Sequence, residues 1–137
     1  MAAKFIFGKN STDDYGALYK IAADGADISS INTNSYKIID ATDTQFNDVR
    51  LDKKEVKYDS SDSLTFQDTS VSWASEAELD SEIDALTDRV ENSSSWSTQI
   101  TTLKAKDFSG ETFPCTKTIP ELAEEKGMTW KSPLEYL

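Results

Sequence analysis

Residues 75–90 read SEAELDSEIDALTDRV and mark a change of structural class along the chain. Ser75 and Glu78 have the spacing of a capping box, in which each side chain bonds to a backbone N–H at the start of a helix. Large apolar residues follow at spacings of four, three and four, and they are Leu79, Ile83, Leu86 and Val90. This spacing is typical of an amphipathic helix, so the stretch predicts a helical segment that begins at about residue 75.

Before this segment, apolar and polar residues alternate in short runs, a pattern typical of strands with one buried face. We expect five or six strands, in the runs 4–7, 15–23, 35–40, 46–51, 55–58 and 63–70. Tyr19 and Tyr36 occupy matching places in two similar runs, which reflects either chance or two strands with similar roles. The last two runs predict a hairpin with a loop of about four residues.

After residue 90, the chain returns to helical spacing on a shifted phase. Asn92 and three serines interrupt the apolar stripe, and Trp96, Ile100 and Leu103 then resume it. Either one helix ends near Asn92 and a second begins near Ser95, or one long helix changes its buried face. We favour two helices, because Asn and Ser are common in turns and caps.

The C-terminal third begins with a loop or extended linker and contains a second capping signature. Thr118 and Glu121 have the capping spacing, and Pro120 lies in the first turn of a short predicted helix that runs to Lys126. Gly127 follows at the place where a left-handed residue usually ends a helix. The last ten residues are unusually apolar for a chain terminus.

The chain is therefore predicted to have an α+β fold. Residues 1–73 are expected to form a β-rich domain with a small antiparallel sheet or sandwich. Residues 74–106 are expected to form a central helical segment of one or two helices. Residues 107–137 are expected to supply a linker, a short helix and a C-terminal docking tail.

Charge excludes two classes of partner. The chain has 137 residues, with 14 Lys and Arg against 25 Asp and Glu, and a formal charge of −11. Clustered Lys and Arg are needed to bind a nucleic-acid backbone or an anionic membrane, and here the largest cluster is Lys53-Lys54. We expect no nucleic-acid partner and no membrane partner. Because no apolar run is long enough for a signal peptide or a transmembrane helix, we expect synthesis in the cytoplasm.

The residues of common catalytic and metal sites are scarce. With no His and one Cys, the chain lacks a Ser-His-Asp triad, the usual zinc ligands and an internal disulfide, and Cys115 is expected to be a small apolar residue. Aspartates cluster at 40–48 and 59–68, where we favour solvated loop charge over a bound cation. We expect no cofactor, no metal, no small-molecule substrate and no enzymatic activity; an enzyme with an unusual carboxylate site is a less favoured hypothesis.

Two apolar features are candidate partner-binding surfaces. The first is the helical stripe, which either packs on the sheet of the same chain or forms a short coiled coil with another copy. The second is the C-terminal tail, which is covered either by the chain's own core or by another subunit. The candidate residues are Leu79, Ile83, Leu86, Val90, Trp130, Leu134, Tyr136 and Leu137.

The chain combines short predicted strands rich in Ser, Thr, Asp and Asn with the predicted helices and linker that follow them. In this respect it resembles small virion proteins of tailed bacteriophages, such as decoration, neck or tail accessory proteins. The resemblance implies a structural role, with incorporation into a virion in several copies and contacts to larger capsid or tail proteins or to itself. The alternative is an acidic inhibitor or adaptor that imitates nucleic acid and binds a basic host protein.

Deletion of residues 128–137 tests the docking role of the tail. We predict that the deletion abolishes assembly or partner binding while the β-rich domain stays folded. If the domain melts, the tail belongs to the core. Circular dichroism and size-exclusion chromatography with light scattering distinguish these outcomes.

Overall fold

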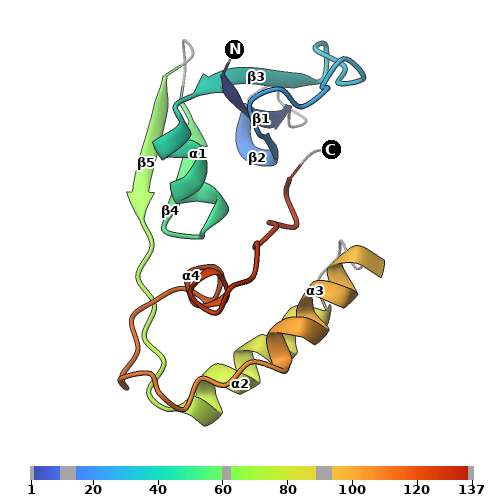
Figure 1. The fold of residues 1–137 in the computed structure, drawn as a ribbon. Coiled ribbons are helices and arrows are strands. Elements are labelled where there is room, and N and C mark those ends of the chain that lie inside the picture. The colour runs from blue at the N-terminus through green and yellow to red at the C-terminus, as the bar shows by residue number, and fades with distance from the viewer. Residues whose placement is uncertain (1, 10–14, 60–62, 89–93, 136–137) are drawn as a thin grey trace. The chain divides into compact units, whose positions relative to one another are not determined.

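The computed structural model describes residues 2–9, 15–59, 63–88 and 94–135 of the chain. It confirms the predicted α+β fold, with small antiparallel sheets in the N-terminal half and most of the helices after them (Figure 1). The chain divides into two compact units. Unit 1 comprises residues 1–69 and 134–137, and unit 2 comprises residues 70–133. Among the described residues, no helix combines the length and the apolar character that crossing a bilayer requires.

Unit 1 contains a three-stranded antiparallel sheet of order β2-β1-β3. Its strands are β1 (Ala3–Lys9), β2 (Tyr15–Ala22) and β3 (Tyr36–Ala41). A second antiparallel pair joins β4 (Lys54–Tyr58) to β5 (Leu64–Asp68), which confirms the predicted hairpin. Strand β1 lies in the centre because it is the most apolar, and it buries Phe5, Ile6 and Phe7.

The core of unit 1 lies on one face of β1. Phe5 and Phe7 point to this face, because successive side chains of a strand alternate between faces. The ring of Phe5 lies 6.0 Å from that of Phe66 on β5, and the ring of Phe7 lies 5.7 Å from that of Tyr58 on β4. Aromatic contacts therefore join the two sheets into one core.

One predicted strand is wrong. Residues 46–51 were expected to be extended, but the structure has helix α1 at Asp43–Arg50. Thr42 and Gln45 form a complete capping box, with Gln45 N–H donating to the Thr42 hydroxyl and Thr42 N–H donating to the Gln45 side chain. Phe46 and Val49 lie three residues apart on the buried face of the helix. The sequence therefore contains a capping-box signal for this helix, which the strand interpretation of the apolar residues overlooked.

Unit 2 is helical and contains α2 (Glu76–Ala85), the 3-10 turn η1 (Leu86–Asp88), α3 (Ser94–Lys104) and α4 (Ile119–Glu125). Ser75 caps α2 as predicted and accepts a hydrogen bond from Glu78 N–H, but the Glu78 carboxylate accepts from Ala74 N–H instead of from Ser75 N–H. The predicted break between helices falls at residues 89–93, which lie outside the described residues.

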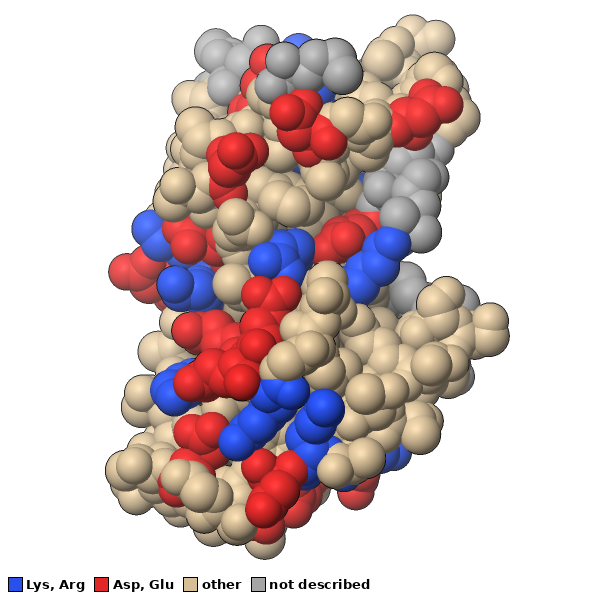
Figure 2. All heavy atoms as spheres, in the orientation of Figure 1, with Lys and Arg blue, Asp and Glu red and all other residues tan. Residues whose placement is uncertain are grey.

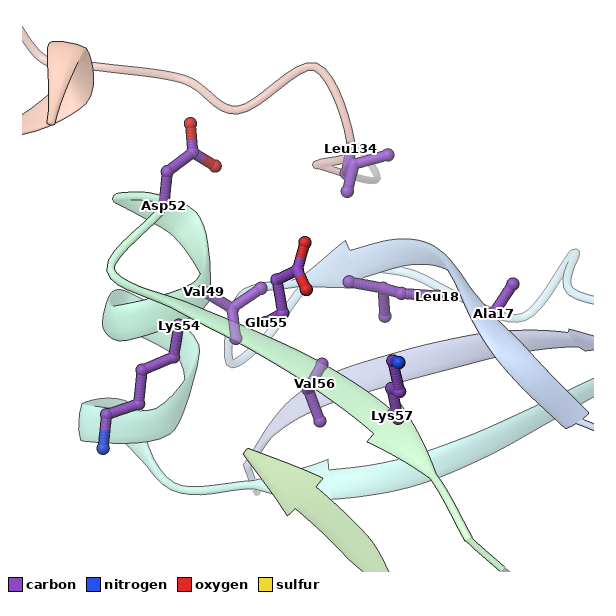
Figure 3. A pocket seen from close by; sticks show the side chains of 9 residues that line it. All are labelled: Ala17, Leu18, Val49, Asp52, Lys54, Glu55, Val56, Lys57 and Leu134. Atoms are coloured by element: carbon purple, nitrogen blue, oxygen red, sulfur yellow. The ribbon is translucent and has the colours of Figure 1, made fainter. Parts of the chain in front are cut away.

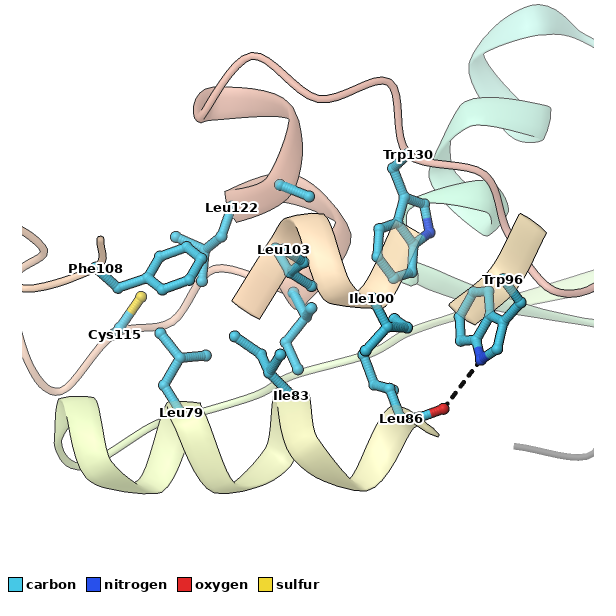
Figure 4. Packing of buried hydrophobic residues seen from close by; sticks show 12 residues of the cluster. Leu79, Ile83, Leu86, Trp96, Ile100, Leu103, Phe108, Cys115, Leu122 and Trp130 are labelled. Atoms are coloured by element: carbon cyan, nitrogen blue, oxygen red, sulfur yellow. Dashed lines mark hydrogen bonds between the residues drawn. The ribbon is translucent and has the colours of Figure 1, made fainter. Parts of the chain in front are cut away.

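The helices of unit 2 enclose their own apolar core (Figure 4). The stripe on α2 and η1 packs against the inward face of α3, and α4 and the loop before it complete the cluster. Its buried members are Leu79, Ile83, Leu86, Trp96, Ile100, Leu103, Phe108, Cys115, Ile119, Leu122, Ala123 and Trp130. The stripe therefore contacts helices, in place of the sheet that one expectation gave it. Cys115 is buried there as a small apolar residue.

The grouping of segments differs from the sequence-based division. The helical segment 74–106 shares one core with most of the segment 107–137, because Trp130 and the residues of α4 pack on α2 and α3. Leu134, in contrast, belongs with the N-terminal sheets. Alternation and helical spacing indicate which face of each element is buried, and they carry no information about which other element covers it.

Helices α1 and α4 end in the same backbone motif with different residues. At the end of α4, Gly127 has a φ of 86°, Gly127 N–H donates to Glu124 C=O, and Met128 N–H donates to Ala123 C=O. At the end of α1, Asp52 has a φ of 58°. Its backbone N–H donates to Val49 C=O, and Lys53 N–H donates to Asp48 C=O. Both are Schellman motifs, so Asp52 holds a left-handed position that favours glycine.

We predict that Asp52→Gly raises the free energy of unfolding by about 1 kcal/mol, because it relieves the left-handed strain and removes a carboxylate from the negative end of the helix dipole. Asp52→Ala also removes the carboxylate but keeps a Cβ in the left-handed position, which alanine tolerates less well than aspartate, so its net effect on stability should be small. Gly127→Ala should lower stability by about 1 kcal/mol. Urea unfolding followed by circular dichroism measures all three. A lower stability of Asp52→Gly would show that the aspartate side chain stabilises the fold by more than the strain costs.

Candidate functional site

The structure places the predicted helical stripe inside unit 2. Leu79, Ile83 and Leu86 are buried against α3, and Val90 lies outside the described residues. A coiled-coil partner needs these side chains on an exposed face. The three described stripe residues therefore face the chain's own core, and another subunit would reach them only if unit 2 opened.

The described part of the predicted tail also packs on the chain's own cores. Trp130 is 4% exposed, and its ring lies edge-on to that of Trp96 at 5.7 Å. Trp96 in turn donates from its indole N–H to Leu86 C=O at 3.0 Å, as the dashed line in Figure 4 shows. Of the two alternatives for the tail, Trp130 follows the first, its own core. Tyr136 and Leu137 lie beyond the described residues.

A glutamine side chain fixes the tail backbone within unit 2. Gln99 on α3 donates from its amide nitrogen to Lys131 C=O at 2.9 Å and accepts from Lys131 N–H at 2.7 Å. One residue earlier in the tail, Trp130 N–H donates to the Glu124 carboxylate at 3.2 Å. The side-chain amide of Gln99 thus forms with the Lys131 backbone the two hydrogen bonds that a neighbouring strand could otherwise form. No pattern in the sequence predicted this contact.

The tail then joins the edge of the sheet in unit 1. Ile21 N–H on β2 donates to Leu134 C=O at 2.9 Å, and Glu135 forms a parallel bridge with Ile21. The Leu134 side chain is half-buried and packs against the core of unit 1. Leu134 also lines a hollow in the surface of unit 1.

That hollow is the candidate site, and it is called the unit 1 groove below. It has a volume of about 330 Å³. Its apolar lining comes from β2, α1, β4 and the tail, and consists of Ala17, Leu18, Val49, Val56 and Leu134 (Figure 3). Its charged lining consists of Asp52, Lys54, Glu55 and Lys57. Four separate segments of the sequence therefore build the groove.

The charges around the groove are not equivalent. The ammonium group of Lys54 lies 3.6 Å from the Asp68 carboxylate, and Figure 3 shows it pointing away from Leu134. In the same view the Asp52 and Glu55 carboxylates project on the side where Leu134 lies. The charged lining thus includes two carboxylates and Lys57 besides Lys54, whose ammonium group has an acidic partner on β5.

A second hollow, in unit 2, is polar. It has a volume of about 270 Å³ and is lined by acidic residues of α2 together with Lys104, Lys106 and Asp107. The ammonium group of Lys104 lies 3.4 Å from the Asp84 carboxylate. Hydrogen bonds from Ser109 lower the pKa of Asp107, with Ser109 N–H donating at 2.9 Å. Within the described ranges, no group of three or more His, Cys, Asp or Glu has an arrangement that could hold a metal ion.

The burial of Trp130 changes the expected effect of losing the tail. Trp130→Ala should lower the free energy of unfolding by about 3–5 kcal/mol, because it leaves a cavity in the core of unit 2. Thr129→Ala, at the exposed neighbouring position, should have little effect. Urea unfolding followed by tryptophan fluorescence and circular dichroism measures both. Equal stability of the two variants would contradict the placement of Trp130 in the core.

Comparison with known proteins adds no identity to this picture. No protein-family model, curated protein or solved structure matches the chain. The candidate site therefore rests on the geometry and charge of the unit 1 groove.

Proposed function

We propose that the chain is a non-enzymatic structural protein that binds another protein through the unit 1 groove. The observation that carries this proposal is an apolar hollow with a charged rim, since most of the other large apolar side chains that the structure describes are buried or half-buried. Apolar lining with a few polar groups is the usual composition of a binding site. The apolar residues supply affinity, and the charged rim selects the partner.

The size of the groove suits side chains of a protein segment. Pockets for drug-sized ligands span roughly 300–1,000 Å³, and a volume of about 330 Å³ lies at the lower end of that range. The edge of β2 beside the groove already pairs with a short backbone segment at Leu134. An extended segment that inserts an apolar side chain between Leu18 and Leu134 is therefore the occupant that we propose.

The charge of the chain favours a basic partner. Unit 1 carries eight Lys and Arg against thirteen Asp and Glu, and the whole chain has a charge of −11. Figure 2 shows acidic side chains spread over the visible face, with Lys and Arg between them. Opposite charge steers association and selects partners, so the proposed segment carries Lys or Arg beside its apolar residue.

The resemblance to tailed-bacteriophage virion proteins supports a particular setting for this binding. In that setting the chain is incorporated into a virion, and the partner is a larger capsid or tail subunit or a further copy of the chain. A repeated lattice offers the same segment many times. The groove then acts in several copies at once, which suits an accessory protein of a particle.

A second candidate, the acidic inhibitor or adaptor, is favoured by one observation. Helix α2 carries five acidic residues in ten positions and no Lys or Arg. Glu78 and Glu82 lie four residues apart, about 6 Å along the exposed side, and thus form part of an acidic row. Against this candidate, Asp84 at the end of the helix is paired with Lys104.

A peptide-binding experiment separates the two candidates. The probe is a short labelled peptide with leucines separated by lysine and serine, and its matched partner has glutamate in place of lysine. Glu55→Lys should weaken binding of the lysine peptide about fivefold or more, because reversing one exposed charge costs roughly 1 kcal/mol. Fluorescence anisotropy at several salt concentrations measures the affinity.

Two variants with the same change in net charge are the controls. Asp24→Lys changes an exposed turn of unit 1, and Glu82→Lys changes the acidic face of α2. The groove proposal expects both to bind the lysine peptide like the natural chain. Equal weakening by Asp24→Lys would contradict it and indicate non-specific attraction, and weakening by Glu82→Lys alone would favour the acidic inhibitor.

A further inference from the structure

Two tyrosine rings stack on the sheet of unit 1, although their strands are not neighbours. Tyr19 lies on β2 and Tyr36 on β3, and β1 runs between these strands. The ring centroids are 4.6 Å apart, with an angle of 25° between the ring planes. Neighbouring strands are spaced about 4.8 Å apart, so strands on either side of β1 are about twice that distance from each other. The two side chains must lean toward each other to stack.

The central strand provides the room for this stacking. Gly8 on β1 pairs with Tyr36, and a Cβ at Gly8 would lie 3.8 Å from the Tyr36 ring and 3.9 Å from the Cβ of Tyr19. The register between β1 and β2 shifts at this point, so that Lys20 pairs with Ile6 and Leu18 pairs with Phe7. Tyr19 is the extra residue between those pairs, and its Cβ lies beside Gly8, which has no side chain.

The pair is partly exposed to solvent. Tyr19 is 42% exposed and is the one exposed large hydrophobic residue among those described, and Tyr36 is half-buried. A hydrogen bond between the two phenols, followed by the electrostatic effect of Tyr19, raises the pKa of Tyr36 above its ordinary value. Tyr36 therefore keeps its phenolic hydrogen at neutral pH, and this hydrogen is available for oxidation.

From this geometry we propose that Tyr19 and Tyr36 are a modification site, at which a one-electron oxidant such as an activated peroxidase joins the two rings as dityrosine. Each phenol gives one electron to the oxidant and its phenolic proton to water. The two phenoxyl radicals then form one carbon–carbon bond between their ortho positions. The ortho hydrogens move as protons to the phenolic oxygens, so two electrons and two protons leave in total.

Stacking favours this step because the unpaired electron of a phenoxyl radical occupies orbitals perpendicular to the ring. Nearly parallel rings at 4.6 Å direct these orbitals toward each other. Held in one fold, the two radicals meet without diffusion, which raises their effective concentration. The product would tie β2 to β3 across β1 and enclose residues 19–36 in a covalent loop, which restricts the unfolded chain.

The test is oxidation of the purified full chain with peroxidase and hydrogen peroxide at low protein concentration. We expect a monomer that has lost two hydrogens by intact mass and that shows the blue fluorescence of dityrosine. Trypsin cleaves after Lys9, Lys20 and Lys37, so the expected product is residues 10–20 joined to residues 21–37. Unfolding in urea before oxidation should remove most of this product.

Conservative variants identify the two rings. Tyr19→Phe and Tyr36→Phe should each reduce the fluorescence and the joined peptide to background. Tyr15→Phe, within the same tryptic peptide as Tyr19, and Tyr58→Phe should leave both unchanged. Formation of the product in Tyr19→Phe at the natural yield, or a product that is mainly a dimer between two chains, would overturn the proposal.

Discussion

Residues 130–135 contribute side chains to both hydrophobic cores of the chain. Trp130 is buried among the helices of unit 2, and Leu134 packs against the aromatic core of unit 1. The backbone between them is held by the Gln99 amide on one side and by the edge of β2 on the other. The sequence suggests that this tail docks on a partner, but its described residues pack into the cores of both units. Their burial determines which surfaces remain for a partner.

The sequence predicts well those features that depend on a few neighbouring residues. The two ends of α4 are examples. The capping box of Thr118 and Glu121 sets its start and Gly127 sets its end, and both signals act through hydrogen bonds within about one turn of the helix. The hairpin of β4 and β5 follows from local alternation and a polar turn. Helix α1 was missed although Thr42 and Gln45 carry an equally local signal, because Phe46, Val49 and Leu51 were interpreted as a continuation of the strand pattern.

The site depends on contacts that no local pattern contains. Leu18, Val56 and Leu134 lie far apart in the sequence and meet only in the folded unit 1. The stripe at Leu79, Ile83 and Leu86 was correctly expected to be helical, since its spacing fixes which face is apolar. The same spacing suits a coiled coil, a helix on a sheet and a helix within a bundle, and only the tertiary fold distinguishes these arrangements.

The extent of internal burial affects how the chain could bind a partner in the way proposed above. Because Trp130 and the described stripe residues Leu79, Ile83 and Leu86 are buried in the chain's own core, the described apolar surface available to a partner is small. The unit 1 groove can accept little more than a side chain or two. A small contact gives weak affinity for one partner molecule, because association must first offset the loss of translational and rotational freedom. Repeated copies overcome this limit through high effective concentration, since each bound contact holds the next one in place. The proposed role within a repeating assembly would therefore offset the small size of the groove, an advantage that binding to a single soluble partner would lack.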